Sequence, residues 1–198
     1  MINVILCDVD GVLIVGETFP VSLARDYGIT RETTAAFFQG RFIDCVLGRA
    51  DLMELLPAHL PNWGWMESAE EFVDYWFKVH SQINSTLVSW LQDWRRAGVP
   101  CFLATVQERH RAAYLRELLA VGRDFDGMFV SCELGQRKDS PAFFEKILSQ
   151  LPKVLPSEVL FIDDSSANLV AAREVGMTTE LFTGNADLDY LLTHYSLG

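Results

Sequence analysis

Short apolar runs alternate with amphipathic stretches along most of this chain. Five runs rich in β-branched and aromatic residues are bounded by polar turns, at residues 2–7, 99–104, 128–131, 159–162 and, more weakly, 178–182. Near-continuous hydrophobicity is typical of strands that are buried on both faces of a parallel sheet. Segments with helical spacing lie between these runs, at residues 87–94, 109–121, 142–151 and 167–175. The alternation predicts βαβ crossovers and therefore an α/β fold with a doubly wound parallel sheet.

One long interval breaks this alternation. Between residues 15 and 85 there is no convincing strand pair, and aromatic residues recur at spacings typical of helices. A structureless loop of this length is uncommon in a compact domain. We therefore expect a mainly α-helical insertion at residues 15–85 and a core made of residues 1–14 and 86–198. Most aromatic side chains of the insertion are expected to form its own hydrophobic core rather than a ligand platform.

Charge and hydropathy exclude several classes of partner. The 198 residues carry a formal net charge of −11, which repels nucleic acid and anionic lipid, so neither is an expected partner. No apolar run approaches the roughly 18 residues needed to cross a bilayer. The apolar N-terminal stretch has no basic segment before it and reads as a first strand, not a signal peptide. We expect a cytoplasmic protein that is monomeric or homodimeric.

The cysteines agree with a reducing compartment. Cys7, Cys45, Cys101 and Cys132 show no CxxC spacing, and three of them lie in or beside apolar runs. A thiol in such a run behaves as a small core residue. We expect buried, reduced cysteines, and neither a disulfide framework nor a zinc site.

Acidic pairs follow two of the predicted strands. Asp8 and Asp10 follow the first strand in the sequence Asp-Val-Asp-Gly, and Asp163 and Asp164 follow the fourth. Ligands of open α/β sheets bind beyond the carboxyl ends of the strands, where these pairs would meet. A turn at the first pair and a helix cap at the second are the plainer alternatives. Converging carboxylates repel each other without a cation, and in the absence of a His or Cys cluster they indicate Mg²⁺.

Two further residues predict an anion site at the same edge. Thr105 ends the second predicted strand in front of a helix start, where a hydroxyl and backbone amides suit a phosphate group. Lys138 comes after the third strand and just before the helix that Pro141 opens. A lone lysine usually serves solubility at the surface. This position favours a charge that faces phosphate instead.

In chain order, the first acidic pair, the threonine, the lysine and the second acidic pair resemble the four motifs of the haloacid dehalogenase-like hydrolase superfamily. The long first interval is similar to that of members with a helical cap (type C1) inserted after the first motif. Four segments resemble the branch of sugar-phosphate phosphatases and of the epoxide hydrolase N-terminal phosphatase domain, at residues 104–109, 131–135, 138–141 and 161–165. The resemblance implies a Rossmann-like core and a Mg²⁺-dependent phosphomonoester hydrolase, with a small phosphorylated metabolite such as a sugar phosphate as substrate.

The resemblance also implies a mechanism. Asp8 would attack phosphorus and form a phosphoaspartate, while Asp10 would protonate the leaving oxygen and later activate water. Mg²⁺ would be held by a carboxylate oxygen of Asp8, the backbone carbonyl of Asp10 and Asp164, with Asp163 nearby or reached through water.

The phosphoryl oxygens would be received by Thr105, Lys138 and the backbone amides of Val106 and Gly11. This sequence departs from the branch at two points. Val106 stands where the branch commonly has Asn, so a side-chain contact is missing. The usual Lys-Pro-Asp-Pro is Lys-Asp-Ser-Pro at residues 138–141, which loses one proline. Neither departure removes a catalytic atom, and both bear on substrate affinity.

Other functions share part of this pattern. A 2-haloacid dehalogenase would use Asp8 as its nucleophile, but it needs neither a general acid at Asp10 nor a metal. A phosphosugar mutase keeps every motif and differs only in protecting the phosphoenzyme from water. A phosphoreceiver-like signalling module has no helical cap, carries adjacent acids at the first strand and is phosphorylated on an Asp near the middle of the chain. In this sequence the adjacent acids Asp163 and Asp164 come late, and a long insertion follows the first strand. A non-catalytic binding protein would not need the complete set of residues.

The sequence does not assign single roles to the polar residues of the insertion or to the histidines. Candidate contacts to the leaving group are Arg41, Arg49, His59 and the aromatic residues around positions 37–42. Solvated helix faces are an equally open interpretation of the three polar residues. Solvent-facing positions are expected for the histidines without a visible partner, which are His80, His110 and His194.

Overall fold

The computed structural model describes residues 1–151, 153–184, 190–191 and 194–195. Its centre is a five-stranded parallel sheet in the order β5-β4-β1-β6-β7. The strands are β1 (Val4–Cys7), β4 (Cys101–Thr105), β5 (Gly127–Val130), β6 (Val159–Asp163) and β7 (Thr178–Leu181). Each strand coincides closely with one of the five apolar runs, so the predicted α/β fold with a doubly wound parallel sheet is confirmed.

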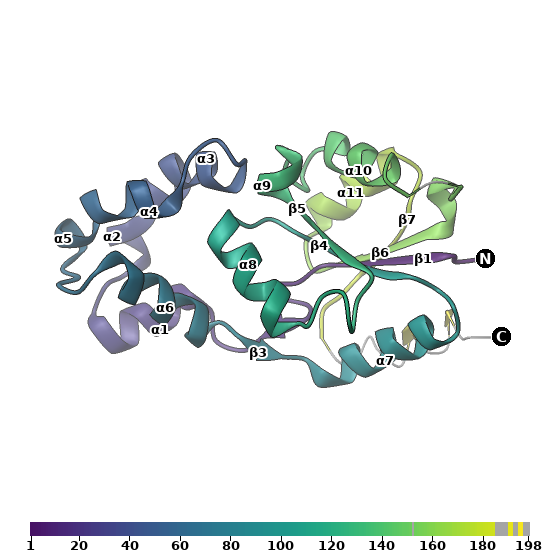
Figure 1. Ribbon diagram of the computed structural model, residues 1–198, viewed down its shortest axis with the longest axis horizontal. Coiled ribbons are helices and arrows are strands. Elements are labelled where there is room, and N and C mark those ends of the chain that lie inside the picture. The colour runs from purple at the N-terminus through teal and green to yellow at the C-terminus, as the bar shows by residue number, and fades with distance from the viewer. Residues whose placement is uncertain (152, 185–189, 192–193, 196–198) are drawn as a thin grey trace.

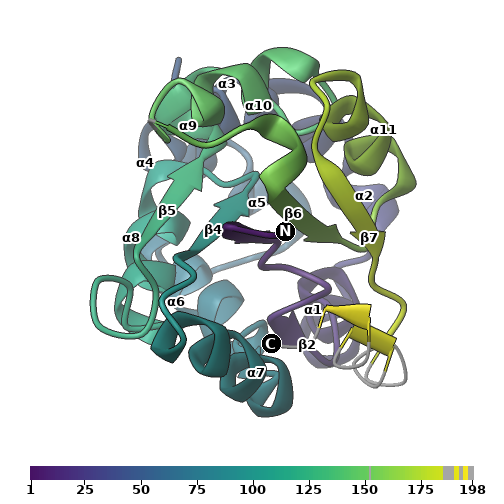
Figure 2. The same cartoon turned by 90° about the vertical axis from the view of Figure 1, so that its right-hand side faces the viewer.

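Helices cover both faces of the sheet (Figure 2). Their bounds are α7 (Ser85–Arg96), α8 (Arg109–Leu118), α9 (Ser131–Leu134), α10 (Pro141–Leu148), α11 (Ser166–Glu174) and the 3-10 turn η3 (Pro156–Glu158). Successive β1 residues alternate between two buried clusters. Ile5 and Cys7 pack with residues of α7 and α8, whereas Val4 and Leu6 pack with residues of α10 and α11. Burial on both faces explains why β1 is apolar throughout.

A separate group of helices lies beyond the carboxyl ends of the strands (Figure 1). In chain order they are α1 (Phe19–Tyr27), α2 (Arg31–Ala36), the π-helical turn η1 (Phe37–Arg41), α3 (Phe42–Val46), α4 (Leu52–Leu55), the 3-10 turn η2 (Leu56–Ala58), α5 (Leu60–Trp63) and α6 (Ala69–Val79). We call this group the cap. It has its own hydrophobic cluster, in which Phe37, Leu52 and Phe72 are at most 2% exposed. The expected helical insertion is therefore present, while its exact limits at residues 15 and 85 stay a prediction.

The cap is joined to the core by a short two-stranded ribbon that the sequence analysis missed. β2 (Ile14–Val15) pairs in antiparallel fashion with β3 (Gln82–Ile83). The expectation that this interval holds no strand pair is wrong at its two ends. Each strand has only two residues, which is too short to produce a period of two in the hydrophobic pattern.

The cysteines and the lengths of the helices were also the subject of predictions from the sequence. All four cysteines are free; Cys7, Cys45 and Cys101 are buried, and Cys132 is half-buried. Every described helix is too short or too polar to cross a bilayer.

Candidate active site

The turn that follows β1 positions Asp8 and Asp10. The carbonyl oxygen of Val9 accepts hydrogen bonds from the amides of Leu13 and Ile14, at 2.8 and 2.7 Å, which returns the chain toward the sheet. Asp8 is 5% exposed, and its Oδ1 accepts a hydrogen bond from the amide of Val9 at 2.6 Å. Both carboxylates therefore stand on a tight, hydrogen-bonded turn at the carboxyl end of the central strand.

Lys138 lies between two buried carboxylates. Its ammonium group forms an ion pair with Asp8 and a second one with Asp163, with Nζ 2.8 Å from Asp163 Oδ2. Burial raises the pKa of Asp8 to about 8, although the charge of Lys138 opposes this shift. Burial by itself would lower the pKa of Lys138, but the charges of Asp8 and Asp163 raise it above the ordinary value. The lysine is thus a buried cation of the site, not a surface residue.

Asp163 is held more firmly than its neighbour Asp164. Asp163 Oδ1 accepts hydrogen bonds from the amide of Ser165 at 2.8 Å and from Nδ2 of Asn168 at 3.0 Å, in addition to the contact with Lys138. Asp164 is exposed at the mouth of the site. Partial burial and then the charge of Asp163 raise the pKa of Asp164. The carboxylate of Asp164 is therefore less constrained than that of Asp163.

Three carboxylates come together in a way that suits a cation. Asp8, Asp163 and Asp164 each offer an oxygen atom within 4.8 Å of the others. Gly11 has φ of +87°, and a Cβ atom on it would overlap the carboxylate of Asp164. Glycine thus lets the turn after β1 approach the end of β6. An oxygen-only donor set with buried negative charge fits Mg²⁺ better than zinc.

A glutamine that the sequence analysis did not single out links Asp10 to Thr105. Gln107 Nε2 lies 2.5 Å from Asp10 Oδ2 and 3.4 Å from Thr105 Oγ1. The backbone amide of Gln107 donates to Ser131 Oγ at 3.0 Å, and this bond fixes the loop between β4 and α8. Gln107 follows Val106, so this loop presents an amide side chain one residue after the expected place. No pattern in the sequence distinguishes it from an ordinary polar residue at a helix start.

Arg111 is a second residue that was missed. It is 1% exposed, and its guanidinium group donates to the carbonyl of Phe77 at 3.0 Å and to the carbonyl of His80. It also lies 3.8 Å from Asp10 Oδ1, an oxygen that accepts no hydrogen bond from the described residues. One buried arginine of the core thus touches both the end of cap helix α6 and Asp10.

His80 and His110 are only partly exposed, and each lies beside a carboxylate that was not expected. His80 is half-buried beside Asp10 and Arg111, and desolvation lowers its pKa against the opposing effect of Asp10. His110 Nε2 lies 2.8 Å from Asp51 Oδ1 of the cap. The expectation failed because both partners are far away in sequence. His194 is exposed, as expected.

A cavity of about 410 Å³ opens above Asp10, between cap and core. Its core side is lined by Asp10, Val106, Gln107 and Arg111, together with His80. Its cap side is lined by Thr18, Phe19, Pro20, Arg31, Thr34, Ala35, Phe38, Gln39, Phe42 and Trp76. Of the expected cap contacts, the aromatic residues Phe38 and Phe42 line it. Arg41, Arg49 and His59 do not. His59 packs among aromatic rings of the cap instead, with its ring 4.8 Å from that of Phe37.

Comparison with known proteins agrees with this arrangement. The sequence model of the haloacid dehalogenase-like hydrolases matches residues 2–176. The chain belongs to this family. It is 37% identical over 76 residues to bifunctional epoxide hydrolase 2 of Rattus norvegicus, covering 36% of this chain and 14% of that protein. It is 32% identical over 94 residues to a sesquiterpene phosphatase of Aspergillus oryzae, covering 48% and 47%. The chain thus spans less than half the length of these curated relatives.

Solved structures share the fold. A haloacid dehalogenase family enzyme of Bacteroides thetaiotaomicron, crystallised as a magnesium complex, superposes with a TM-score of 0.81 at 21% identity. The superposition covers 96% of this chain and 98% of that chain. The sheet with an inserted cap is therefore the haloacid dehalogenase-like architecture.

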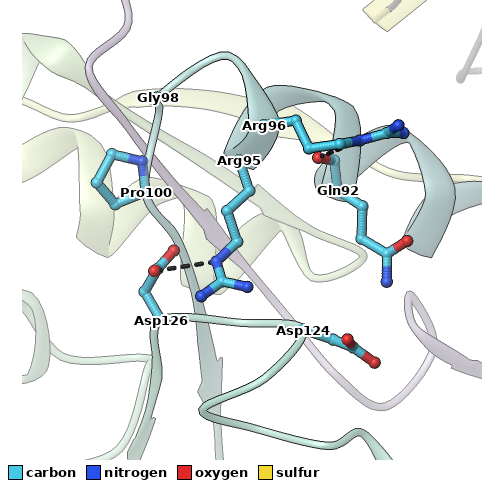
Figure 3. A pocket seen from close by; sticks show the side chains of 7 residues that line it. All are labelled: Gln92, Arg95, Arg96, Gly98, Pro100, Asp124 and Asp126. Atoms are coloured by element: carbon cyan, nitrogen blue, oxygen red, sulfur yellow. Dashed lines mark hydrogen bonds and ion pairs between the residues drawn. The ribbon is translucent and has the colours of Figure 1, made fainter.

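This haloacid dehalogenase-like chain has a second hollow, of about 760 Å³, which includes none of the residues of the cluster around Asp8. Figure 3 shows the residues that line it. It lies at the opposite edge of the sheet, where Pro100 precedes β4 and Asp126 precedes β5. Its charges are already paired: Arg95 Nε lies 3.0 Å from Asp126 Oδ1, and Arg96 forms an ion pair with Asp93. Both arginines that line this hollow are thus paired with carboxylates, and the cluster around Asp8 is the stronger candidate site.

Proposed function

We propose that this chain is a Mg²⁺-dependent phosphomonoester hydrolase that acts through a phosphoaspartate on Asp8. The observation that carries the proposal is the geometry around Asp8. A buried carboxylate at a strand end contacts the cation Lys138, faces two more carboxylates within 4.8 Å, and has a third acid, Asp10, one residue beyond Val9. The phosphatase named among the relatives supports the same reaction class.

In the proposed first step, an Asp8 oxygen attacks phosphorus and the bond from phosphorus to the leaving oxygen breaks. Asp10 gives its proton to that oxygen, so that a neutral alcohol departs. Lys138 orients Asp8 and adds positive charge beside the transferring group, and Thr105 and the amides of Val106 and Gly11 receive phosphoryl oxygens. Bound Mg²⁺ would offset the negative charge of the phosphate and of Asp8.

In the second step, the Asp10 carboxylate takes a proton from water as the water oxygen attacks phosphorus. The bond from Asp8 to phosphorus breaks, and inorganic phosphate is released. Asp10 serves both steps because Gln107 holds one of its oxygens and leaves the other without a hydrogen bond from the described residues. The Mg²⁺ ligands in this proposal are Asp8, the carbonyl of Asp10 and Asp164, with Asp163 behind them.

The proposed substrate is a small phosphorylated metabolite, for which the cavity between cap and core has room. A sugar phosphate is the example that the sequence resemblance favours. The four free cysteines support a reducing, cytoplasmic setting. A monomer or a homodimer is proposed, with neither nucleic acid nor membrane as partner because of the acidic net charge.

The test is release of phosphate from p-nitrophenyl phosphate and a panel of monoesters, with Mg²⁺ and with EDTA. We expect turnover that needs the metal and disappears in Asp8→Asn, with circular dichroism showing that the variant is folded. Substantial Mg²⁺-dependent turnover by Asp8→Asn would refute the nucleophile. Metal binding without turnover of any monoester would instead favour a mutase or a binding protein.

A further inference from the structure

The cavity above Asp10 has two chemically different sides. Toward the core it presents Asp10, Gln107 and Arg111, which are charged or polar. Toward the cap it presents aromatic side chains as its largest lining groups. A phosphomonoester bound with phosphorus at Asp8 would extend its leaving group toward this aromatic side.

The aromatic side is a preformed wall. The ring of Phe38 lies 5.2 Å from that of Phe42 and 5.5 Å from that of Trp76, and Phe42 lies 5.7 Å from Trp76. Behind them the buried ring of Phe19 stacks on Trp76 at 4.8 Å and 24°. The three front rings are only partly buried, so each keeps surface that faces the cavity. Mutual ring contacts hold this apolar surface in place without a ligand.

The backbone under this wall is unusual. Phe37–Arg41 forms a π-helical turn, in which the amide of Phe42 donates to the carbonyl of Phe37. π-Helical turns are rare and are found frequently at functional sites. Here the turn separates α2 from α3, and Phe38 and Phe42 both line the cavity. A local departure from α-helix thus coincides with the aromatic wall.

The cap side also has polar lining residues, but none of them is both buried and without a partner. Thr34 is buried, and its hydroxyl already donates to the carbonyl of Arg31 at 3.3 Å. Thr18, Arg31 and Gln39 line the cavity at exposed positions, where water can hydrogen-bond to them. Each hydroxyl of a buried sugar needs a hydrogen-bond partner, because an unpaired one costs about 1–3 kcal/mol. A polyhydroxylated leaving group that packs against Phe38, Phe42 and Trp76 would leave hydroxyls unpaired, so it matches the aromatic wall poorly.

We propose that the substrates are phosphomonoesters of apolar alcohols, whose hydrocarbon body packs against Phe38, Phe42 and Trp76. This proposal rests on the phosphatase function above, and it replaces the sugar-phosphate example with an apolar leaving group. The cavity of about 410 Å³ lies within the range of about 300–1,000 Å³ of small-molecule sites. The apolar wall supplies affinity, and the Asp10 side supplies the reacting groups.

The first experiment compares primary alkyl phosphates from methyl to octyl with ribose 5-phosphate and glucose 6-phosphate, all with Mg²⁺. We expect kcat/KM to rise by about fourfold for each methylene, until the cavity is full. Sugar phosphates should be hydrolysed more slowly than the alkyl phosphate of equal carbon number. A flat alkyl series, or faster hydrolysis of a sugar phosphate, would overturn this inference while the phosphatase function stands. No hydrolysis of any ester would refute the phosphatase function itself.

The second experiment removes the wall. Trp76→Ala and Phe38→Ala should each lower kcat/KM for octyl phosphate about tenfold more than for methyl phosphate, because the longer chain uses the ring surface. The matched control is Tyr27→Ala, which truncates a half-exposed ring of α1 outside the cavity and should leave the octyl-to-methyl ratio unchanged. Should Trp76→Ala not fold, Trp76→Leu keeps an apolar core residue and tests the same ratio. Equal ratios in the wall variants and wild type would contradict the proposal.

Discussion

The side-chain amide of Gln107 lies 2.5 Å from the carboxylate of Asp10. The same nitrogen lies 3.4 Å from the hydroxyl of Thr105, and the guanidinium group of Arg111 lies 3.8 Å from the other Asp10 oxygen. Two residues of the segment after β4 thus orient an acid of the turn after β1. The orientation of Asp10 depends on where the chain enters α8. It also depends on the cap, because Arg111 donates hydrogen bonds to the carbonyls of Phe77 and His80.

Gln107→Ala should lower kcat/KM about 10- to 100-fold, because a hydrogen bond to a charged group is worth about 1.5–3 kcal/mol. Most of the loss should fall on kcat, since Asp10 acts on the reacting bonds. Gln107→Glu places a carboxylate against Asp10 and should cost more than the alanine variant. Steady-state kinetics with p-nitrophenyl phosphate measure both. Wild-type kcat in Gln107→Ala would show that Asp10 does not need this donor.

Lys138→Met should both abolish turnover and destabilise the fold by about 3–5 kcal/mol, because it leaves the buried charge of Asp163 without its cation. Urea unfolding measures the free energy. The double variant Lys138→Met with Asp163→Asn should recover much of the stability and none of the activity. Lys78→Met is the control: this lysine is 67% exposed and pairs with Asp74, so its loss should cost less than about 1 kcal/mol. Equal effects at the two lysines would contradict the buried ion pair.

Gly11→Ala should weaken Mg²⁺ binding, because the added Cβ overlaps the Asp164 carboxylate. Gly64→Ala is the matched control, since Gly64 has a similar φ of +84° but no atom within 4 Å of the added Cβ. Both variants share the backbone strain of an L residue at positive φ, and only Gly11→Ala displaces a carboxylate. Isothermal titration with Mg²⁺ compares the two. The same affinity in both variants would remove Asp164 from the metal site.

The strands and the acidic pairs were predictable because the physics that marks them is local. A strand buried on both faces is apolar along most of its length. β1 is apolar throughout, and β4 and β6 are apolar up to their last residues, Thr105 and Asp163. Carboxyl ends of parallel strands share one edge, so the pairs at Asp8 and Asp163 had to be neighbours once the sheet was inferred. Their roles as nucleophile and metal ligands stay predictions until activity is measured.

Residues defined by tertiary contacts were not predictable. Gln107, Arg111 and His80 have polar neighbours in sequence and look like ordinary helix ends. The hydrogen bond from Gln107 to Asp10 joins residues 97 positions apart, and the one from Arg111 to His80 joins residues 31 positions apart. The ribbon of β2 and β3 was missed because each strand has only two residues, too few to show the alternation of apolar and polar residues that marks a strand. Aromatic residues around positions 37–42 were expected as leaving-group contacts, but which rings face the cavity was not predictable: Phe37 and Phe38 are adjacent in sequence, yet one is buried in the cap and the other lines the cavity.

Stability should fall as the pH rises above 9, because of buried thiols. Burial raises the pKa of Cys101 to about 12 and that of Cys45 to about 11, against 9.0 for an ordinary thiol. Above pH 9 the unfolded chain loses these protons while the folded chain keeps them, so the unfolded state binds fewer protons and becomes favoured. The effect is about 1 kcal/mol per thiol for each pH unit above 9. Urea unfolding at pH 8 and 10.5 should show that the free energy of unfolding declines less for Cys101→Ala than for wild type. An identical decline in both proteins would contradict a contribution from the Cys101 thiol.

The contact between cap and core near Gly48 offers the last test. Gly48 has φ of +72°, and a Cβ there would overlap the backbone carbonyl of Cys132; nearby, Ser131 Oγ donates to the carbonyl of Val46 at 2.7 Å. Gly48→Ala should therefore push α3 of the cap away from α9. The control Gly28→Ala has φ of +70° and open space, so it carries only the backbone strain of about 1–2 kcal/mol.

Because the displaced cap would also move the aromatic wall, Gly48→Ala should raise KM for p-nitrophenyl phosphate and lower the melting temperature more than Gly28→Ala does. Fluorescence-monitored melting and steady-state kinetics measure both effects. If the two alanine variants melt together and share the wild-type KM, the approach of Gly48 to Cys132 does not hold the cap against the core.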